Sequence, residues 1–229
     1  MDHRLSLAAS LYETCRVGCD IGSDHALLPV ELLRRGICET MIVSDISEKA
    51  LSHAAQQVHA RHLEGRVRLV CADGLDAITE PVGCVSIMGM GGETAADILL
   101  AHPERLHGAV LILSVQTDPH LARRAVEQIG YHFERECLCF ERGRYYQVWR
   151  CEEGRRSALT DEEARYGSLV YTTPSPLLHD YLLFRLSISE KKRTGLLMGK
   201  EAKPDELREA ENALTFYASR LALVEGRQH

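Results

Sequence analysis

Short apolar runs alternate with amphipathic stretches along the first two-thirds of the chain. The runs have the length of strands and end in turn residues, so they predict buried strands. Most stretches between them repeat apolar positions every three or four residues and predict helices. Such alternation is typical of a parallel sheet with helices on both faces. The predicted strands are 15–21, 40–46, 66–74, 84–92 and 108–115, and the predicted helices are 25–36, 47–63, 93–102 and 119–130.

The pattern changes after residue 130. Segments 131–141 and 144–152 both look like strands, and the short sequence RG between them predicts an antiparallel hairpin. A parallel sheet that ends in such a hairpin is the arrangement of class I methyltransferases, whereas dinucleotide-binding folds usually lack the hairpin. We therefore expect an α/β fold of the class I methyltransferase (Rossmann-like) type, with a mostly parallel, seven-stranded sheet.

A polar segment around Gly154 predicts a linker. We therefore expect one domain over residues 1–155 and a second, small domain over residues 156–229. The second begins with Thr160 and Glu163 at the spacing of a capping box, which marks the start of a helix.

Two longer helical segments follow in this second domain. The first, 175–193, is amphipathic, and the second begins at Pro204. In the second, apolar residues recur at alternating steps of three and four, which predicts a short coiled-coil seam that pairs with the preceding helix. The seam residues are Leu207, Ala210, Leu214, Tyr217, Leu221 and Val224.

Composition narrows the classes of protein to consider. No apolar run approaches the roughly 20 residues that cross a bilayer, and the N-terminus lacks the apolar core of a signal peptide, so we expect a cytoplasmic protein without membrane contact. The 8 cysteines form no C-x-x-C pair and have no histidines at zinc-ligand spacing, so we expect reduced thiols and no metal. The net charge of −6 weighs against nucleic-acid binding unless positive charge gathers in a patch.

The turn after the first predicted strand, CDIGSDHALLP, contains acids and a single glycine. Dinucleotide-binding loops use three glycines to rest a pyrophosphate on a helix N-terminus, and Asp20 and Asp24 would repel that group. Gly22 still lets the backbone pass close to a ligand. A cofactor with a cationic centre and no phosphate, such as S-adenosylmethionine, therefore suits this turn better than NAD.

More acids follow the next strands, at the edge where ligands of open parallel sheets bind. Asp45 lies near the offset at which an acid accepts hydrogen bonds from ribose hydroxyls, and Asp73 would accept one from an adenine amino group. The glycine run at 89–92 would let a planar group approach the backbone. Each of these also has a purely structural explanation, as a helix-capping acid or a turn, and so do Asp24 and His25.

Four segments together resemble the TrmK family: DIGSDHALLP, ADGLDAI, IMGMGGETAADIL and LILSVQTDPHLARRAV. These are bacterial S-adenosylmethionine-dependent tRNA methyltransferases that act on N1 of an adenine in the D arm. The resemblance implies a class I methyltransferase domain and a coiled-coil domain that helps to grip tRNA. It implies that Asp24 is the catalytic aspartate. It also implies cofactor contacts at Asp20, Gly22, Asp45, Asp73 and Gly74.

The chain departs from the family pattern at two places. Leu27 stands where the family often has a tyrosine, and Val115 stands in a loop where it commonly has a proline. That loop includes Gln116 and is expected to shape the target-base pocket, so the departures bear on how substrate binds.

The complete predicted site consists of the catalytic Asp24, residues that contact the cofactor and residues that contact tRNA. The predicted contacts to S-adenosyl-L-methionine are Asp20, Gly22, Ser23, His25, Asp45, Ile46, Asp73, Gly74, Met88 and Gly89. The predicted contacts to tRNA are Met90, Gly91, Gly92, Gln116, Lys191, Lys192 and Arg193. With Lys200 and Lys203, these last three form a basic cluster at the hairpin tip, which a solvated helix end explains equally well. A second basic group comprises Arg4, Arg123, Arg124, Arg142 and Arg144.

Two other functions remain open at this point. One is a small-molecule methyltransferase whose helices dimerise, which tight tRNA binding would argue against. The other is a non-catalytic RNA-binding protein on the same fold, which a lack of cofactor binding would support. An NAD-dependent oxidoreductase is disfavoured because the G-x-G-x-x-G motif is missing. The sequence does not determine the oligomeric state.

Overall fold

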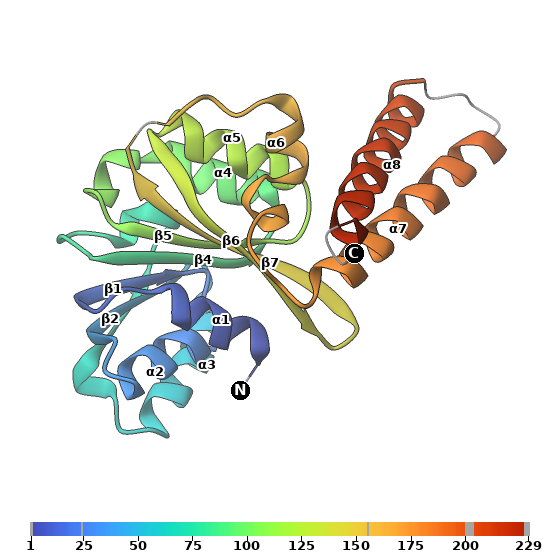
Figure 1. Cartoon of the computed structure of the whole chain (residues 1–229). Coiled ribbons are helices and arrows are strands. Elements are labelled where there is room, and N and C mark those ends of the chain that lie inside the picture. Colours follow the sequence, from blue (N-terminus) through green and yellow to red (C-terminus); the bar gives the residue numbers. More distant parts are fainter. Residues whose placement is uncertain (1, 24, 155, 200–203, 227–229) are drawn as a thin grey trace. The chain divides into compact units, whose positions relative to one another are not determined.

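The computed structural model describes residues 2–23, 25–154, 156–199 and 204–226. The chain forms two compact units, Met1–Thr173 and Pro174–His229. The first is a seven-stranded sheet with helices on both faces, and the second contains a pair of long helices (Figure 1). None of the helices in the described ranges combines the length and hydropathy of a membrane-spanning segment.

The sheet has the strand order β3-β2-β1-β4-β5-β7-β6. Strands β1 to β5 run parallel, and β7 pairs antiparallel with both β5 and β6. The predicted class I methyltransferase fold is thereby confirmed. The strand order reverses between β1 and β4, and ligands of such sheets bind at this reversal, beyond the carboxyl ends of the strands. The strands are β1 Cys15–Ile21, β2 Cys38–Asp45, β3 Val67–Cys71, β4 Cys84–Met90, β5 Val110–Val115, β6 Tyr131–Glu141 and β7 Arg144–Glu153.

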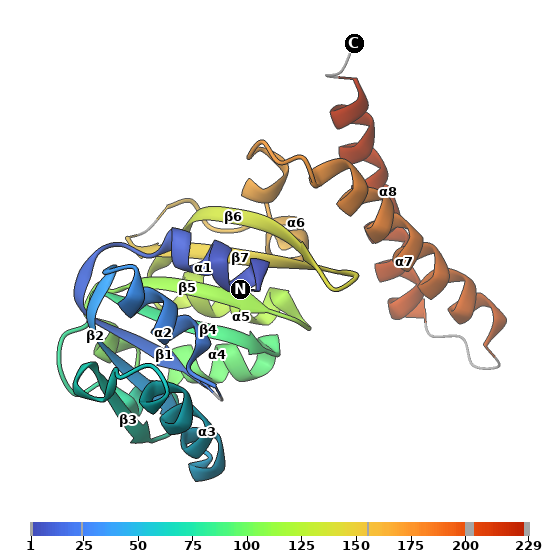
Figure 2. The ribbon, with the colours of Figure 1, turned by 90° about the horizontal axis from the view of Figure 1, so that it is seen from below.

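Helices α1, α2 and α3 cover one face of the sheet, and α4 and α5 cover the other (Figures 1 and 2). Alternate strand residues face two cores: Met41 and Val43 lie in the core under α1 to α3, and Ile42 lies in the core under α4 and α5. Burial on both faces explains the continuous apolar runs of the central strands β1, β2, β4 and β5, whereas the edge strand β3 is half-buried or exposed along its length. The helices of this unit are α1 His3–Leu11, α2 Leu27–Arg34, α3 Glu48–His59, α4 Gly92–Ala101, α5 Pro119–Gln128 and α6 Asp161–Tyr166, with 3-10 turns at Glu64–Arg66, Gly74–Ala77, Pro103–Leu106 and Leu169–Tyr171.

Helix α1 is an element that the sequence pattern did not predict. Asp2 caps it, because its carboxylate accepts hydrogen bonds from the backbone N–H groups of Arg4 at 2.9 Å and Leu5 at 3.4 Å. The apolar side of α1 packs against α2 and the β6–β7 hairpin. This packing places Arg4 beside the hairpin.

Residues 156–173, which the sequence assigned to the second domain, belong to the first compact unit. Arg123 of α5 and Glu136 of β6 form an ion pair of 2.7 Å with 1% and 2% of their side chains exposed. The second carboxylate oxygen of Glu136 accepts hydrogen bonds from the N–H groups of residues 168–170 at 2.8 to 3.3 Å. The boundary between the units therefore falls after Thr173, later than predicted. Since Arg123 is buried in this pair, it is also not part of a basic surface for RNA.

The second unit is an antiparallel hairpin of α7 (Leu178–Met198) and α8 (Pro204–Glu225). The direction follows from His179 of α7, which lies 3.4 Å from Glu225 at the end of α8. Arg185 of α7 lies over the ring of Tyr217 at 5.1 Å. Every residue of the predicted seam is buried or half-buried, and Phe216, which lies off that seam, is buried as well.

Candidate cofactor and substrate site

A cavity of about 630 Å³ lies at the carboxyl ends of β1, β2 and β4. Four aspartates line it, and the described lining residues include no lysine or arginine. An acidic wall of this kind disfavours phosphate groups and favours a cationic or neutral ligand. The lining comprises Ile21, Gly22, Asp45, Ile46, Ala72, Asp73, Gly74, Leu75, Asp76, Met90, Gly91, Thr94, Asp97, Ile98, Ala101 and His102.

The turn after β1 forms one side of the cavity. Gly22 has a φ of +73°, and its N–H donates to the carbonyl oxygen of Ser44 at 2.8 Å. A Cβ at this position would lie 2.0 Å from the terminal carbon of Met90. The left-handed backbone conformation therefore favours glycine here, whereas the Met90 methyl is the end of a flexible side chain and could move aside.

Asp20 lies beneath this turn and not in the cavity wall. Its side chain is buried and accepts hydrogen bonds from the hydroxyl groups of Ser23 and Ser86. The hydroxyl of Tyr12 donates to Ser86 at 2.6 Å, so buried hydrogen bonds connect the end of α1 with the turn. Burial raises the pKa of Asp20 from 3.8 to about 6, and the two hydrogen bonds oppose that rise. Asp20 is thus placed to hold the turn.

Asp45 and Asp73 lie in the cavity wall after neighbouring strands. Asp45 Oδ1 accepts a hydrogen bond from the backbone N–H of Ser47 at 2.8 Å, which orients the carboxylate. Ile98 and Ile46 add apolar surface to the same wall, and the Ile46 side chain is 74% exposed. A nucleoside needs acceptors for its hydroxyl and amino groups and an apolar surface for its base, and this wall offers both.

The glycine run at 89–92 divides between two roles. Met90 and Gly91 line the cavity. Gly92 is buried as the first residue of α4, and a Cβ there would lie 2.0 Å from the carbonyl oxygen of Asp118. Gly92 therefore serves the packing of two backbone segments, and it is absent from the cavity wall.

Four more of the predicted cofactor residues lie outside the cavity wall. Ser23 is buried beneath the turn, and Met88 packs against the core under α1 and α2. His25 is exposed and stacks on His53, with ring centroids 5.3 Å apart. Gly89 is exposed at the end of β4, on the side of the β5 loop.

The predicted catalytic residue, Asp24, lies outside the described residues, and so do Lys200 and Lys203. Its described neighbours, Ser23 and His25, follow the cofactor turn and precede α2.

Two of the basic residues predicted to bind RNA are engaged within the helical hairpin. Lys192 donates to Glu209 at 2.9 Å, and Arg193 donates to Glu190 at 2.7 Å. Lys191 is exposed. Part of the positive charge is thus compensated within the hairpin. The Lys192–Glu209 pair depends on the register of the two helices, whereas Arg193 and Glu190 are three residues apart on α7.

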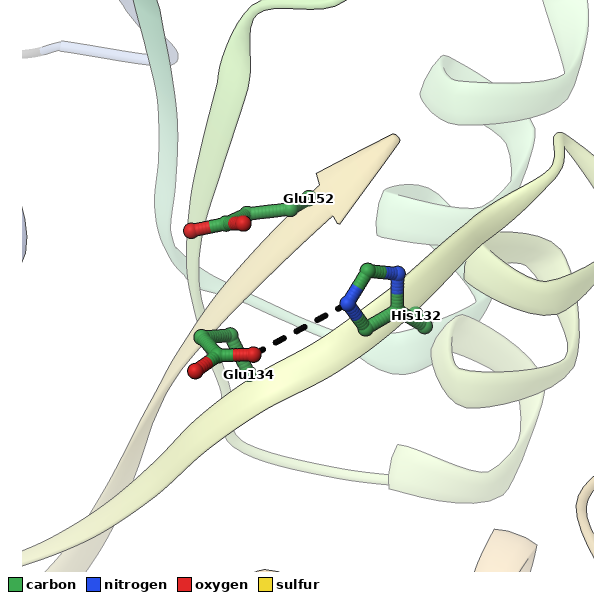
Figure 3. Close-up of side chains that lie close together, drawn as sticks. All are labelled: His132, Glu134 and Glu152. Atoms are coloured by element: carbon green, nitrogen blue, oxygen red, sulfur yellow. Dashed lines mark ion pairs between the residues drawn. The ribbon is translucent and has the colours of Figure 1, made fainter. Parts of the chain in front are cut away.

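A second cluster of potential ligand atoms lies on the β6–β7 hairpin (Figure 3). It comprises His132 and Glu134 of β6 and Glu152 of β7, whose ligand atoms lie within 4.8 Å of one another. Both carboxylates already accept from guanidinium groups, Glu134 from Arg156 at 2.8 Å and Glu152 from Arg150 at 2.6 Å. The acidic charge is compensated by the protein, and we assign no metal to this cluster.

Comparison with known proteins agrees with this fold. Residues 1–149 match the family described as a methyltransferase domain. The tRNA (adenine(22)-N(1))-methyltransferase of Bacillus subtilis (strain 168) is 30% identical over 163 residues, which are 70% of this chain and 68% of that protein.

Solved structures extend the likeness over nearly the whole chain. The crystal structure of Streptococcus pneumoniae Sp1610, described as a candidate tRNA (m1A22) methyltransferase, is 27% identical with a TM-score of 0.85 and covers 96% of this chain and 99% of its own. The same protein in complex with S-adenosyl-L-methionine is 26% identical with a TM-score of 0.82, over 95% of this chain and 98% of its own. The methyltransferase-domain match and the identity to the B. subtilis enzyme show that the chain belongs to the tRNA (adenine(22)-N(1))-methyltransferase, or TrmK, family.

Proposed function

We propose that this chain transfers a methyl group from S-adenosyl-L-methionine to N1 of an adenine in the D arm of tRNA, which is adenine 22 in the relatives named above. The observation that carries the proposal is the acid-lined cavity at the carboxyl ends of β1, β2 and β4 in a chain of this family. An enzyme that uses this cofactor on tRNA would act in the cytoplasm.

The cavity residues divide into polar and apolar contacts with the cofactor. Asp45 accepts hydrogen bonds from the ribose hydroxyls, and Asp73 accepts one from the adenine amino group. Ile46 and Ile98 give the base an apolar surface. The bound cofactor supplies an electrophilic methyl group on a positively charged sulfur, and the acidic wall suits that charge.

We assign Asp24 to the transfer step. Neutral adenine has a lone pair on N1, so attack on the methyl group needs no prior loss of a proton, but the product is cationic. A carboxylate nearby stabilises that developing charge or accepts a hydrogen bond from the N6 amino group. Asp24→Asn should lower the single-turnover rate about 100-fold and change cofactor affinity much less. Lost cofactor binding with a normal rate at saturation would instead make Asp24 a binding residue.

We assign the hairpin of α7 and α8 to tRNA binding. Lys191 is exposed there, and the ion pairs of Lys192 and Arg193 involve exposed or half-exposed side chains that can exchange partners at low cost. The competing role is dimerisation of a small-molecule methyltransferase. Retention of activity on free adenosine and no binding of tRNA would favour that alternative.

The deciding experiment is incubation of the purified protein with unmodified tRNA and isotope-labelled S-adenosyl-L-methionine, followed by nucleoside mass spectrometry. We expect labelled 1-methyladenosine from tRNA that has adenine at position 22, and none when that adenine is replaced by guanine. Label in another nucleoside would reject the assigned target. Cofactor binding without any methylated product would favour a non-catalytic RNA-binding protein.

A further inference from the structure

Arg4 reaches from α1 to the carboxyl edge of the sheet. Its guanidinium carbon lies 5.0 Å from the centroid of the Tyr146 ring, near the start of β7. The start of β7 lies beside the end of β5, because the hydroxyl of Ser114 donates to the carbonyl oxygen of Gln147 at 2.9 Å. The cation–π contact with Tyr146 helps to hold the guanidinium group at this edge.

One nitrogen of this guanidinium group is buried without a partner. Within the described ranges, nothing accepts a hydrogen bond from Arg4 Nη1. The two acids closest to Arg4 in the fold, Asp2 and Glu141, accept hydrogen bonds from its backbone N–H, at 2.9 and 3.2 Å. No ion pair of its side chain occurs among the residues that the structure describes. A buried, unsatisfied donor on a charged group is costly, so a ligand acceptor is the simplest explanation.

A second donor converges on the same place. The position of a Cβ built on Gly89 lies 3.6 Å from Arg4 Nη1 and 3.8 Å from Gln116 Nε2. Gly89 has no side chain to separate the two donors. Arg4 as a whole is half-buried, and Gly89 and Gln116 are exposed, so the guanidinium group borders solvent here although Nη1 itself is buried. The neighbouring Met90 lines the acid-walled cavity, so this place borders the cofactor site.

We propose that Arg4 and Gln116 bind a backbone phosphate of the tRNA beside the target adenosine. A positively charged guanidinium group and a neutral amide donor that face one point match an anionic acceptor, and arginine is the side chain that best fits phosphate geometry. The base itself is a poorer match, because a donor on N1 would block the lone pair that must attack the methyl group. The contact is a positioning one: it fixes the nucleotide while the acidic cavity next to it excludes phosphate and accepts the cofactor. The proposal rests on the proposed tRNA methyltransferase function.

Salt dependence of tRNA binding tests the contact. Arg4→Ala should weaken binding of an unmodified tRNA transcript about tenfold and lower the slope of log K against log salt by about one unit. The KM for tRNA should rise while the rate at saturation changes little, because a phosphate contact is made equally in the ground state and the transition state. Affinity for S-adenosyl-L-methionine should not change.

Three variants complete the design. Arg16→Ala is the matched control, since Arg16 is exposed at the amino end of β1, at the opposite edge of the sheet, and its slope and KM should equal those of the wild type. Arg4→Lys keeps the charge and should keep the slope while losing part of the affinity. Gln116→Glu places a negative charge beside Arg4 and should weaken tRNA binding even if Arg4→Ala fails to fold.

The outcomes separate this inference from the function on which it rests. If the wild type methylates the transcript but Arg4→Ala shows an unchanged slope, Arg4 does not bind a phosphate, whatever happens to affinity. An unchanged affinity in both Arg4→Ala and Gln116→Glu overturns the site altogether. If the wild type binds tRNA with the expected slope but gives no methylated product, the proposed reaction fails and the phosphate contact stands.

Discussion

At the scale of single residues, the cavity separates two kinds of acid. Asp45 lies in the wall with its orientation set by Ser47, whereas Asp20 lies beneath the turn within hydrogen bonds from serine hydroxyls. The first is placed to meet a ligand and the second to shape the backbone that meets it. Substitutions at the two positions should therefore fail in different ways.

Asp45→Ala should weaken binding of S-adenosyl-L-methionine by about 1–3 kcal/mol, because the ribose hydroxyls lose their acceptor. Isothermal titration calorimetry measures the loss. Asp45→Asn is the matched variant, since its amide oxygen still accepts from Ser47, so any loss that it shares with alanine comes from the ligand contact. Affinity equal to that of the wild type in both variants would remove Asp45 from the ribose role.

Asp20 should make stability depend on pH. Its pKa in the folded protein, about 6, lies above the ordinary value of 3.8, so between about pH 4 and 6 the folded state binds more protons than the unfolded state. Its contribution to the free energy of unfolding therefore falls as the pH rises through this window and stays low above it. Urea denaturation measures the free energy of unfolding of the wild type and of Asp20→Asn. Between pH 4 and pH 7, the wild type should lose about 1–3 kcal/mol of this free energy relative to the variant. If the free energy of unfolding depends on pH in the same way in both proteins, the buried Asp20 carboxyl is not the cause of the pH dependence.

At the scale of elements, the ion pair of Arg123 and Glu136 joins segments that no local pattern connects. Glu136 of β6 binds α5 through Arg123 and holds the backbone of residues 168–170 with its second oxygen. Arg123 also lies 4.2 Å from the centroid of the Trp149 ring of β7. The segment after β7 is thus fixed by a charge inside the protein.

Glu136→Gln should lower the free energy of unfolding by about 3–5 kcal/mol, because Arg123 is left buried without its counter-charge. Glu134→Gln is the matched control on the same strand: its partner Arg156 is 58% exposed, and the loss should stay within about 1 kcal/mol. Chemical denaturation compares the two. Equal losses would show that burial of the pair does not govern its contribution.

The sequence predicts the elements of this unit better than its contacts. Apolar runs mark the central strands β1, β2, β4 and β5 because these strands are mostly buried, and the single-glycine turn is visible because Gly22 answers a backbone requirement. Arg123 of α5 is buried because it contacts Glu136 of β6 and Gln147 of β7, and Lys192 pairs with Glu209 because of the register of α7 and α8. Neither contact can be read from one segment of the sequence. Two of the buried positions of α1 are the alanines Ala8 and Ala9, and its first turn is fixed by Asp2, so apolar spacing alone does not reveal it.

At the scale of the whole molecule, two units carry different parts of the proposed activity. The first contains the sheet and the cavity, and it extends through the segment held by Glu136. The second is a hairpin with its own packed seam. The boundary after Thr173, and not the polar segment after β7, is therefore the place to separate them.

A chain of residues 1–173 should fold and bind S-adenosyl-L-methionine with the affinity of the full chain but methylate tRNA at least tenfold more slowly at low tRNA concentration, since it lacks the proposed RNA-binding hairpin. A chain that ends at 155 is the control for the boundary, and it should be far less stable because Glu136 loses its backbone donors. Circular dichroism, calorimetry and a methylation assay measure these properties. Full activity on tRNA from residues 1–173 would give the hairpin another role, most simply dimerisation.

The contact between Gly22 and Met90 has a consequence for how such chains can diverge. Any side chain at position 22 would meet the terminal carbon of Met90 at 2.0 Å while also adopting a left-handed backbone. Gly22 follows β1, Met90 is the last residue of β4, and both border the cavity. A side chain at position 22 should therefore push the Met90 methyl aside, so a single substitution should change the shape of the pocket on both sides at once.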